Sequence, residues 1–186
     1  MPTDASQMPL VQRAWTFAYA CHAAVGQRRK YSGEPYIVHP AKVAAIVRQV
    51  PHTPAMLCAA WLHDVVEDTE VSLADIERLF GPAVANLVDM LTNPTKSPGL
   101  SWRDKKQIDL EHIWRAAPAA KTVKLADIID NCTDIRALDP QFAPVYLAEK
   151  REQLAVLREG DPVLWSLASD IIGDCELRPL NIATMC

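Results

Sequence analysis

Apolar residues recur along most of the chain at every third or fourth position, and strict alternation of apolar and polar residues is nearly absent. A period of 3.6 residues is typical of amphipathic helices, whereas a half-buried strand repeats every second residue. The pattern therefore predicts an all-α fold, with room for one short β-hairpin near residues 28–37. The predicted helices cover residues 8–25, 40–50, 54–68, 72–80, 82–92, 101–116, 119–138, 143–159 and 161–176.

Local signals support several of these boundaries. Ser72 followed by Asp75 has the spacing of a capping box, in which each residue bonds the backbone of the other at a helix start. Gly26 and Gly160 stand where helices are expected to stop, and glycine is the residue most often found just after a helix. The segments between these signals are long enough for helices of ordinary length.

Composition agrees with one helical domain. The chain has 186 residues, of which 49% are hydrophobic and 23% charged, enough for a sizeable core. No repeat or linker divides it, so we expect residues 1–186 to form one domain, with residues 177–186 as an irregular tail. The five cysteines are scattered without a CxxC pair, which favours reduced thiols.

The charge and the hydropathy of the chain limit the binding partners and the cellular location that we expect. The net charge of −4 supplies no global basic field for nucleic acid. No apolar stretch reaches the length of a membrane span, and the first residues lack the pattern of a signal peptide. We therefore expect no nucleic-acid or membrane partner and a cytoplasmic location, while a homo-oligomer stays open.

The predicted helix over residues 54–68 carries four ionisable residues in an apolar background. On an ideal helix, His63, Asp64, Glu67 and Asp68 fall within about 140° and so share one face. Burying unpaired charge is costly, and imidazole with carboxylate is a ligand set for a divalent cation. We interpret His63 and Asp64 as metal ligands. Glu67 and Asp68 would then orient a bound water or carry its protons.

Two adjacent residues cannot complete a metal site, so further ligands must come from elsewhere. His39, in YIVHP, and Asp127, in VKLADIIDN, are the candidates that fit. The alternative is that a His–Asp pair consists of two ordinary polar residues on a helix, an interpretation that we do apply to His22. For His63 and Asp64, the apolar background and the two acids that follow favour the metal site.

A basic run precedes this region. Arg28, Arg29 and Lys30 are consecutive in the long connection over residues 26–39. Such cations gather phosphate oxygens, and arginine also stacks on bases, although a solvated surface run is the alternative. Because the run lies only nine residues before His39, we link it to the metal site. A metal beside a phosphate clamp suggests hydrolysis of a phosphorylated substrate.

Taken in order, four segments resemble the HD-domain hydrolases of the RelA/SpoT type, in particular the small stand-alone alarmone hydrolases. The segments are GQRRKYSGEPYIVHP, AAWLHDVVEDT, SLADIERLFGPAVANLVDMLT and VKLADIIDN, and with the intervening helices they span about residues 10–160. The resemblance implies an all-α HD-domain helical bundle. It also implies a Mn²⁺-dependent hydrolase that removes the 3′-pyrophosphate from (p)ppGpp-like nucleotides. The synthetase half of the bifunctional relatives is absent, so only hydrolysis is expected.

The resemblance assigns roles to individual residues. The metal ligands would be His39, His63, Asp64 and Asp127, the catalytic acids Glu67 and Asp68, and the substrate contacts Arg28, Arg29, Lys30, Ser32, Asn131, Lys105, Lys106, Tyr146, Lys150 and Arg151. The chain departs from the family near the last metal ligand. Ile128 replaces a basic residue, and Asp130 stands where histidine or an aromatic residue often occurs. These positions leave open whether guanosine or adenosine alarmones are preferred.

Two other functions remain as alternatives. The chain could be another HD-domain nucleotide phosphohydrolase, which would act on nucleotides that lack a 3′-pyrophosphate. It could also be a nucleotide-binding regulator with little turnover. A complete ligand set argues against the regulator, because a protein that only binds need not keep every ligand.

Overall fold

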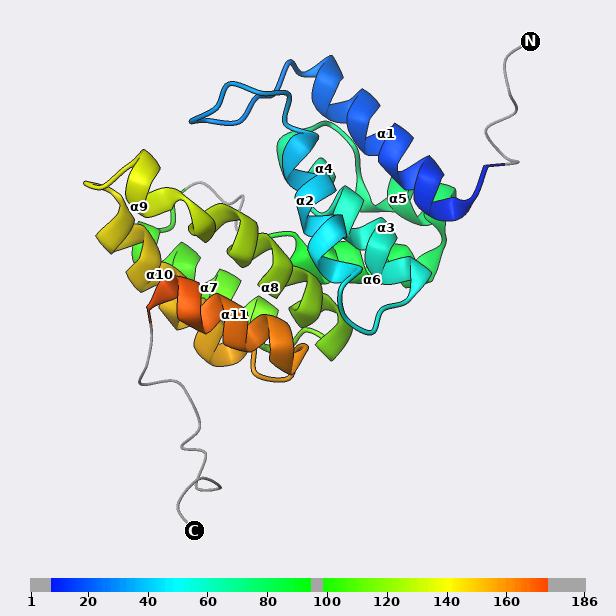
Figure 1. The fold of residues 1–186 in the computed structure, drawn as a ribbon. Helices are drawn as coiled ribbons and strands as arrows, with labels where there is room; N and C mark the ends of the chain where they lie inside the picture. The colour runs from blue at the N-terminus through cyan, green and yellow to red at the C-terminus, as the bar shows by residue number, and fades with distance from the viewer. Residues whose placement is uncertain (1–7, 95–98, 174–186) are drawn as a thin grey trace.

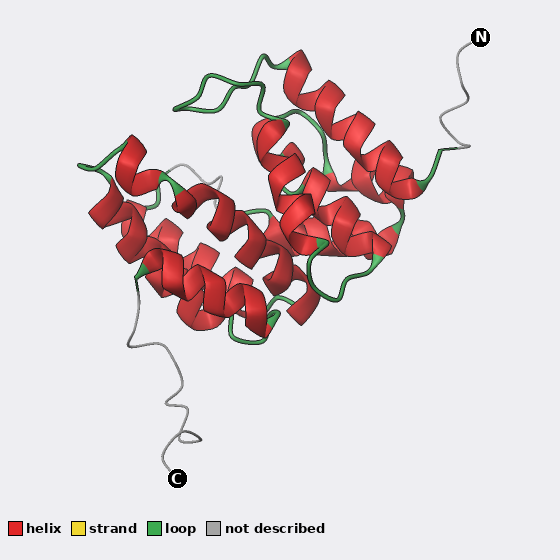
Figure 2. Cartoon of the chain, viewed as in Figure 1, coloured by secondary structure: helices red, strands yellow, loops and turns green. Residues whose placement is uncertain are grey.

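The computed structural model describes residues 8–94 and 99–173, and this part of the chain is built from helices joined by loops (Figures 1 and 2). The helices are α1 (Leu10–Ala24), α2 (Val38–Val47), α3 (Pro54–Leu62), α4 (Val65–Asp68), α5 (Leu73–Phe80), α6 (Pro82–Leu91), α7 (Trp102–Trp114), α8 (Pro118–Thr133), α9 (Ile135–Leu138), α10 (Ala143–Val156) and α11 (Pro162–Ile172). The prediction of an all-α fold is confirmed. In the described residues, the hairpin expected near residues 28–37 is reduced to one isolated bridge between Arg28 and Pro35.

The local signals act as expected at α5. The Ser72 hydroxyl accepts a hydrogen bond from the backbone N–H of Asp75 at 3.2 Å, and the Asp75 carboxylate accepts one from the backbone N–H of Ser72 at 3.3 Å. These two bonds form the predicted capping box. At the other end of α5, Gly81 has a φ of 84°, a conformation that favours glycine and lets α6 begin directly afterwards.

The single helix predicted over residues 54–68 is wrong, because the chain turns at His63 and Asp64 between α3 and α4. The backbone of Asp64 has a φ of −97° and a ψ of −6°. The His63 ring explains the break, since its Nδ1 atom hydrogen-bonds the carbonyl of Ala60 at 3.0 Å. In an uninterrupted helix that carbonyl would accept from the backbone N–H of residue 64. The helix predicted over residues 119–138 is likewise divided, at Asp134.

The core centres on α3 and α8. Every side chain of α3 from Met56 to Leu62 is buried, as expected for a helix that is apolar on all sides. Helix α8 packs against α2, α3 and α6 and also against α10 and α11, so it lies between the two halves of the bundle (Figure 1). Two acidic residues of α8, Asp127 and Asp130, contact His39 at the start of α2, whereas Lys121 pairs with Glu159 on the other side of the helix.

Several sequence predictions fall partly outside the described chain. The predicted tail over residues 177–186 lies outside it, as does part of the predicted loop over residues 93–101. The reduced cysteines within the described chain are Cys21, Cys58 and Cys132, and the last two are buried. None of the described helices is both long and apolar enough to cross a membrane.

Gly160, in the α10–α11 connection, lies against α8. A Cβ atom at this position would lie 2.7 Å from Cδ1 of Leu125 and 3.1 Å from the backbone carbon of Lys121. Leu125 is fully buried in the core, so its side chain is packed on all sides. We therefore expect Gly160→Ala to lower the free energy of unfolding by about 1–3 kcal/mol through overpacking. Urea unfolding measures this loss, and the exposed Gln141→Ala serves as the control. An unfolding midpoint equal to that of the wild type would contradict the close packing.

Candidate metal centre and adjoining pocket

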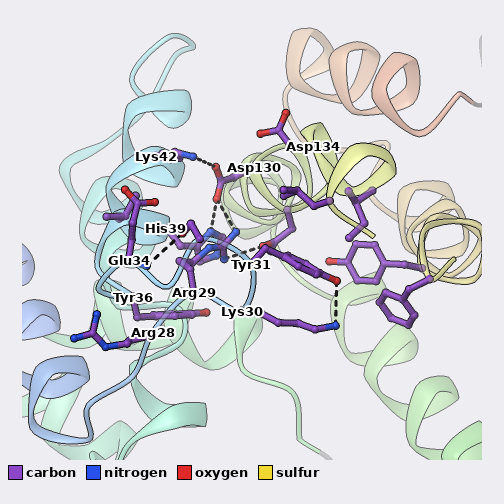
Figure 3. A pocket seen from close by; sticks show the side chains of 17 residues that line it. Arg28, Arg29, Lys30, Tyr31, Glu34, Tyr36, His39, Lys42, Asp130 and Asp134 are labelled. Atoms are coloured by element: carbon purple, nitrogen blue, oxygen red, sulfur yellow. Dashed lines mark hydrogen bonds and ion pairs between the residues drawn. The ribbon is translucent and has the colours of Figure 1, made fainter. Parts of the chain in front are cut away.

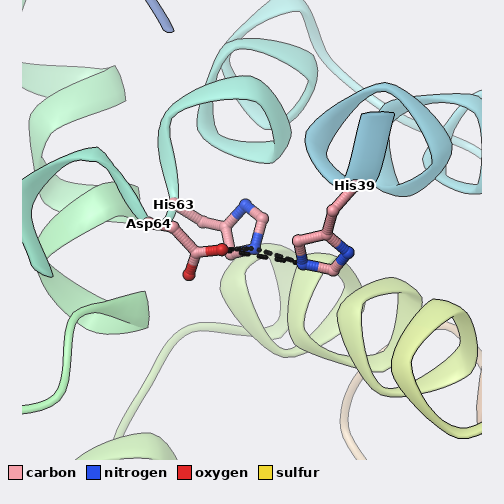
Figure 4. Close-up of side chains that lie close together, drawn as sticks. All are labelled: His39, His63 and Asp64. Atoms are coloured by element: carbon pink, nitrogen blue, oxygen red, sulfur yellow. Dashed lines mark hydrogen bonds and ion pairs between the residues drawn. The ribbon is translucent and has the colours of Figure 1, made fainter. Parts of the chain in front are cut away.

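Two histidines and an aspartate converge from separate elements. His39 lies in the first turn of α2, and His63 and Asp64 form the α3–α4 turn (Figure 4). The Nε2 atoms of His39 and His63 are 3.2 Å apart. Oδ2 of Asp64 lies 3.0 Å from Nε2 of His63 and 3.6 Å from Nε2 of His39. One ligand atom from each residue lies within 4.8 Å of the other two, which is close enough for all three atoms to bind one ion.

Asp127 on α8 adds a fourth predicted ligand to this cluster. Its Oδ1 atom lies 3.2 Å from Nε2 of His39 and 3.9 Å from Nε2 of His63. The carboxylate is held from behind, because Asn131 donates to Oδ1 at 2.6 Å and Lys124 contacts Oδ2 at 2.9 Å. All four residues predicted to bind the metal are therefore gathered in one place by α2, α8 and the α3–α4 turn.

The chemistry of the donor atoms fits a divalent cation. Nδ1 of His39 bonds the Asp130 carboxylate at 2.6 Å, and Nδ1 of His63 bonds the Ala60 carbonyl. Both acceptors favour a ring proton on Nδ1, so the two Nε2 atoms face each other. They repel each other unless a proton or a metal ion lies between them. Two ligand atoms that each lie about 2.1 Å from one ion are about 3 Å from each other. The Nε2 atoms of His39 and His63, which are 3.2 Å apart, have this spacing.

The electrostatics of the cluster also favour a cation. Although burial lowers the pKa of His39, its hydrogen bonds to Asp127 and Asp130 raise the value to about 9. Burial raises the pKa of Asp127, but the Lys124 ammonium and the neighbouring imidazoles hold it well below its usual range. The ionised carboxylates thus favour the protonated, positively charged form of the imidazoles. A metal that binds here would take the place of protons.

The two acids of α4 bond to different parts of the chain. Glu67 accepts a hydrogen bond from the backbone N–H of Asn93, and burial raises the pKa of its carboxyl group despite that bond. Asp68 is exposed and accepts a hydrogen bond from Nε2 of Gln27 at 2.8 Å. Because of the break after α3, the two acids do not simply extend one face from His63, as an ideal helix predicted.

A cavity of about 510 Å³ adjoins the cluster and shares His39 with it (Figure 3). It lies between the α1–α2 loop and the region of α8, α9 and α10. The predicted substrate contacts that line it are Arg28, Arg29, Lys30, Ser32, Asn131 and Tyr146. Arg29 donates to Oδ1 of Asn131 at 3.1 Å, so the loop and α8 are joined across the cavity.

The loop also reaches the far wall of the cavity. The Tyr31 hydroxyl donates to Oδ2 of Asp139 at 3.0 Å, and Nζ of Lys30 lies 3.6 Å from the same oxygen. Nζ of Lys30 lies 5.2 Å from the centre of the Phe142 ring. Arg29 and Lys30 therefore stand at the cavity wall and already have carboxylate neighbours, Asp130 and Asp139, whereas Arg28 donates to the carbonyl of Gly33.

The other four predicted substrate contacts do not line this cavity: Lys105, Lys106, Lys150 and Arg151. Lys106 pairs with Glu149 between α7 and α10. Lys150 is buried, with Nζ 5.1 Å from the centre of the Tyr146 ring. Arg151 lines a different cavity. The structure thus gives these four residues no place in the pocket beside the metal cluster.

Three contacts to the predicted metal ligands were missed by the sequence analysis. Asp130, identified only as a departure from the family, bonds His39. Lys124 contacts Asp127, and the Tyr36 hydroxyl donates to Oδ2 of Asp64 at 2.5 Å. A signal for two of them existed, because Lys124 and Asp130 each lie three residues from Asp127 on the same helix.

Comparisons with known proteins place this site in a family. The family model described as HD domain matches residues 14–158. MESH1 of Drosophila melanogaster, named a guanosine-3′,5′-bis(diphosphate) 3′-pyrophosphohydrolase, is 37% identical over 141 residues, which cover 74% of this chain and 75% of that protein. The bifunctional (p)ppGpp synthase/hydrolase SpoT of Escherichia coli is 37% identical over 146 residues, 75% of this chain but 20% of SpoT.

Two further comparisons agree. A probable guanosine-3′,5′-bis(diphosphate) 3′-pyrophosphohydrolase of Synechocystis is 40% identical over 135 residues, 71% of this chain and 17% of that protein. A solved structure, described as a metazoan ortholog of SpoT that hydrolyzes ppGpp, matches with a TM-score of 0.80 and 30% identity, covering 92% of this chain and 98% of that chain. The chain belongs to the HD-domain family, and the resemblance recognised in its sequence is confirmed.

The contact between Asp130 and His39 predicts a change in metal affinity. Partners that orient a metal-binding histidine typically contribute 10–100-fold to affinity. We expect Asp130→Asn to weaken Mn²⁺ binding by about that factor, because the amide loses the negative charge that holds the His39 ring. Calorimetric titration of metal-free protein with Mn²⁺ measures it. Asp134→Asn, exposed on the same cavity, is the matched control. Equal affinities for the two variants would show that the Asp130 contact is dispensable.

Proposed function

We propose that this protein is a Mn²⁺-dependent hydrolase that removes the 3′-pyrophosphate from (p)ppGpp-like nucleotides. One observation carries the proposal: His39 belongs both to the ligand cluster and to the wall of the cavity that holds Arg28, Arg29 and Lys30. A metal centre that opens onto a cation-lined pocket suits a phosphorylated substrate. The names of the Synechocystis and Drosophila relatives support the choice of a 3′-pyrophosphorylated guanosine nucleotide.

The metal would be held by His39, His63, Asp64 and Asp127. When bound, a divalent cation lowers the pKa of a coordinated water and polarises the phosphoryl group. The mixed imidazole and carboxylate set suits Mn²⁺. Asn131 and Lys124 keep the Asp127 carboxylate in place for this role through the contacts described above.

The remaining residues would bind the nucleotide and move protons. Arg29 and Lys30 offset the charge of the phosphates. Glu67 accepts a proton from the attacking water, and Asp68 orients that water. The water oxygen bonds the phosphorus, and the bond from phosphorus to the 3′ oxygen breaks. The 3′ oxygen takes a proton, so that the products are pyrophosphate and a nucleotide with a free 3′-hydroxyl.

The substrate and the setting complete the proposal. Guanosine and adenosine alarmones are both within it, because Asp130 and Ile128 depart from the family beside the expected nucleotide contacts. The proposal also includes a cytoplasmic location and the lack of a nucleic-acid or membrane partner. Of these, the lack of a nucleic-acid partner agrees with the net charge of −4.

A substrate panel tests the activity directly. Metal-free protein should be inactive and should release pyrophosphate from ppGpp, pppGpp or ppApp once Mn²⁺ is added, whereas GTP, which lacks a 3′-pyrophosphate, should stay intact. Chromatography of the products shows whether the 5′ phosphates survive. Turnover of GTP alone would indicate another HD-domain phosphohydrolase. Tight nucleotide binding without turnover would indicate a regulator, and full activity after rigorous metal removal would exclude the metal mechanism.

The division of labour between Glu67 and Asp127 gives a second test. Glu67→Gln should keep the bound metal but lower kcat by about 10²–10⁴-fold, the usual contribution of a general acid or base. Asp127→Asn should instead weaken metal binding, because it alters an atom 3.2 Å from Nε2 of His39. Bound metal and kcat are measured side by side, with the exposed Glu70→Gln as control. If Glu67→Gln loses metal in parallel with activity, Glu67 is a ligand and the division of roles is wrong.

A further inference from the structure

The carboxylate of Asp68 is tied to the loop that follows α1. Gln27 Nε2 donates to Oδ2 of Asp68 at 2.8 Å, across 41 positions of sequence. Asp68 is exposed and ends the four-residue helix α4, so α4 alone gives its side chain little support. The bond from Gln27 is thus an external restraint on an acid that otherwise stands at a short helix end.

The Gln27 amide lies between Asp68 and a buried histidine. Nδ1 of His22 lies 2.7 Å from Oε1 of Gln27, and only 1% of His22 is exposed. Burial lowers the pKa of His22 despite the opposing hydrogen bond to Gln27, which favours a neutral ring with one N–H. Because the NH₂ group of Gln27 donates to Asp68, Oε1 of Gln27 faces Nδ1 of His22 and accepts from the tautomer that carries its proton there. A flipped amide would direct oxygen at the Asp68 carboxylate.

The backbone of Gln27 is fixed as well. Its N–H donates to the carbonyl of His22 at 3.0 Å, and its carbonyl accepts from the N–H of Tyr36 at 3.2 Å. The ring of His22 packs against that of Tyr36 with centroids 4.8 Å apart, and the Tyr36 hydroxyl in turn donates to Asp64. The loop that holds Gln27 is therefore anchored to the same residues that surround the metal cluster.

We propose that Gln27 is a positioning residue that holds the Asp68 carboxylate in place for the reaction. The proposal rests on the role given to Asp68 in the proposed function. A glutamine suits the task because its amide donates a hydrogen bond without adding charge. A lysine or arginine in its place would form an ion pair with the carboxylate and compete with the water that Asp68 is proposed to orient. His22 supports the arrangement by fixing the amide.

The test removes the hydrogen bond and keeps the bulk. Gln27→Met has a side chain of similar length without donor or acceptor. With ppGpp and Mn²⁺, we expect kcat to fall by about 10–100-fold, because a misplaced group loses much of its effect, while KM changes by less than about twofold. Bound Mn²⁺ should equal that of the wild type. Gln12→Met, at an exposed position of α1, should match the wild type in every respect.

A double-mutant cycle separates positioning of Asp68 from a general effect on the fold. If Gln27 acts through Asp68, Gln27→Met should lower kcat in the wild type and leave it unchanged in Asp68→Asn. Equal effects in both backgrounds, or no effect of Gln27→Met in the wild type while Asp68→Asn is slow, would overturn the inference and leave the proposed function standing. Wild-type turnover by Asp68→Asn would instead overturn the role of Asp68 itself, and the inference with it.

Discussion

Two imidazole nitrogens that face each other at 3.2 Å impose the constraint around which the rest of the site is arranged. Two such nitrogens repel each other unless a proton or a metal ion lies between them, so the site needs positive charge. Here α2 supplies His39, the turn after α3 supplies His63, and α8 supplies Asp127. Acceptors behind each ring leave the imidazoles little freedom to turn away. The apolar packing of α3 and α8 therefore holds a geometry in which a metal ion can take the place of the protons.

Much of this arrangement could be predicted from residue patterns. The helical period of the apolar residues was sufficient to predict the fold. The motif segments around His39, His63 and Asp127 were sufficient to predict that these residues lie together. The break after Leu62 could not be predicted from the period, because it depends on the His63 ring competing for the carbonyl of Ala60. Helix propensity averages over a segment and does not register one side chain that bonds its own backbone.

Contacts between distant segments were the other part that sequence alone could not supply. Asp130 looked like a departure from a family pattern, and only the packing of α2 against α8 shows that it bonds His39 across 91 positions. The resemblance made Lys150 a candidate substrate contact, but its side chain is buried beside Tyr146. A lysine can occupy either face of a helix that is only weakly amphipathic, and which face is covered depends on neighbours far away in the chain.

The contacts of the basic loop have a consequence for selectivity. Arg29 lies 3.5 Å from the carboxylate of Asp130, and Lys30 lies 3.6 Å from that of Asp139. An anion that enters the cavity therefore competes with carboxylates that already pair with the cations. Its binding free energy includes only the difference between the new ion pairs and the old ones. The ion pair of the exposed Lys30 is weak, and that of the partly buried Arg29 costs more to replace. A ligand with several phosphate groups would pair with both cations at once, which favours it over a ligand with a single phosphate.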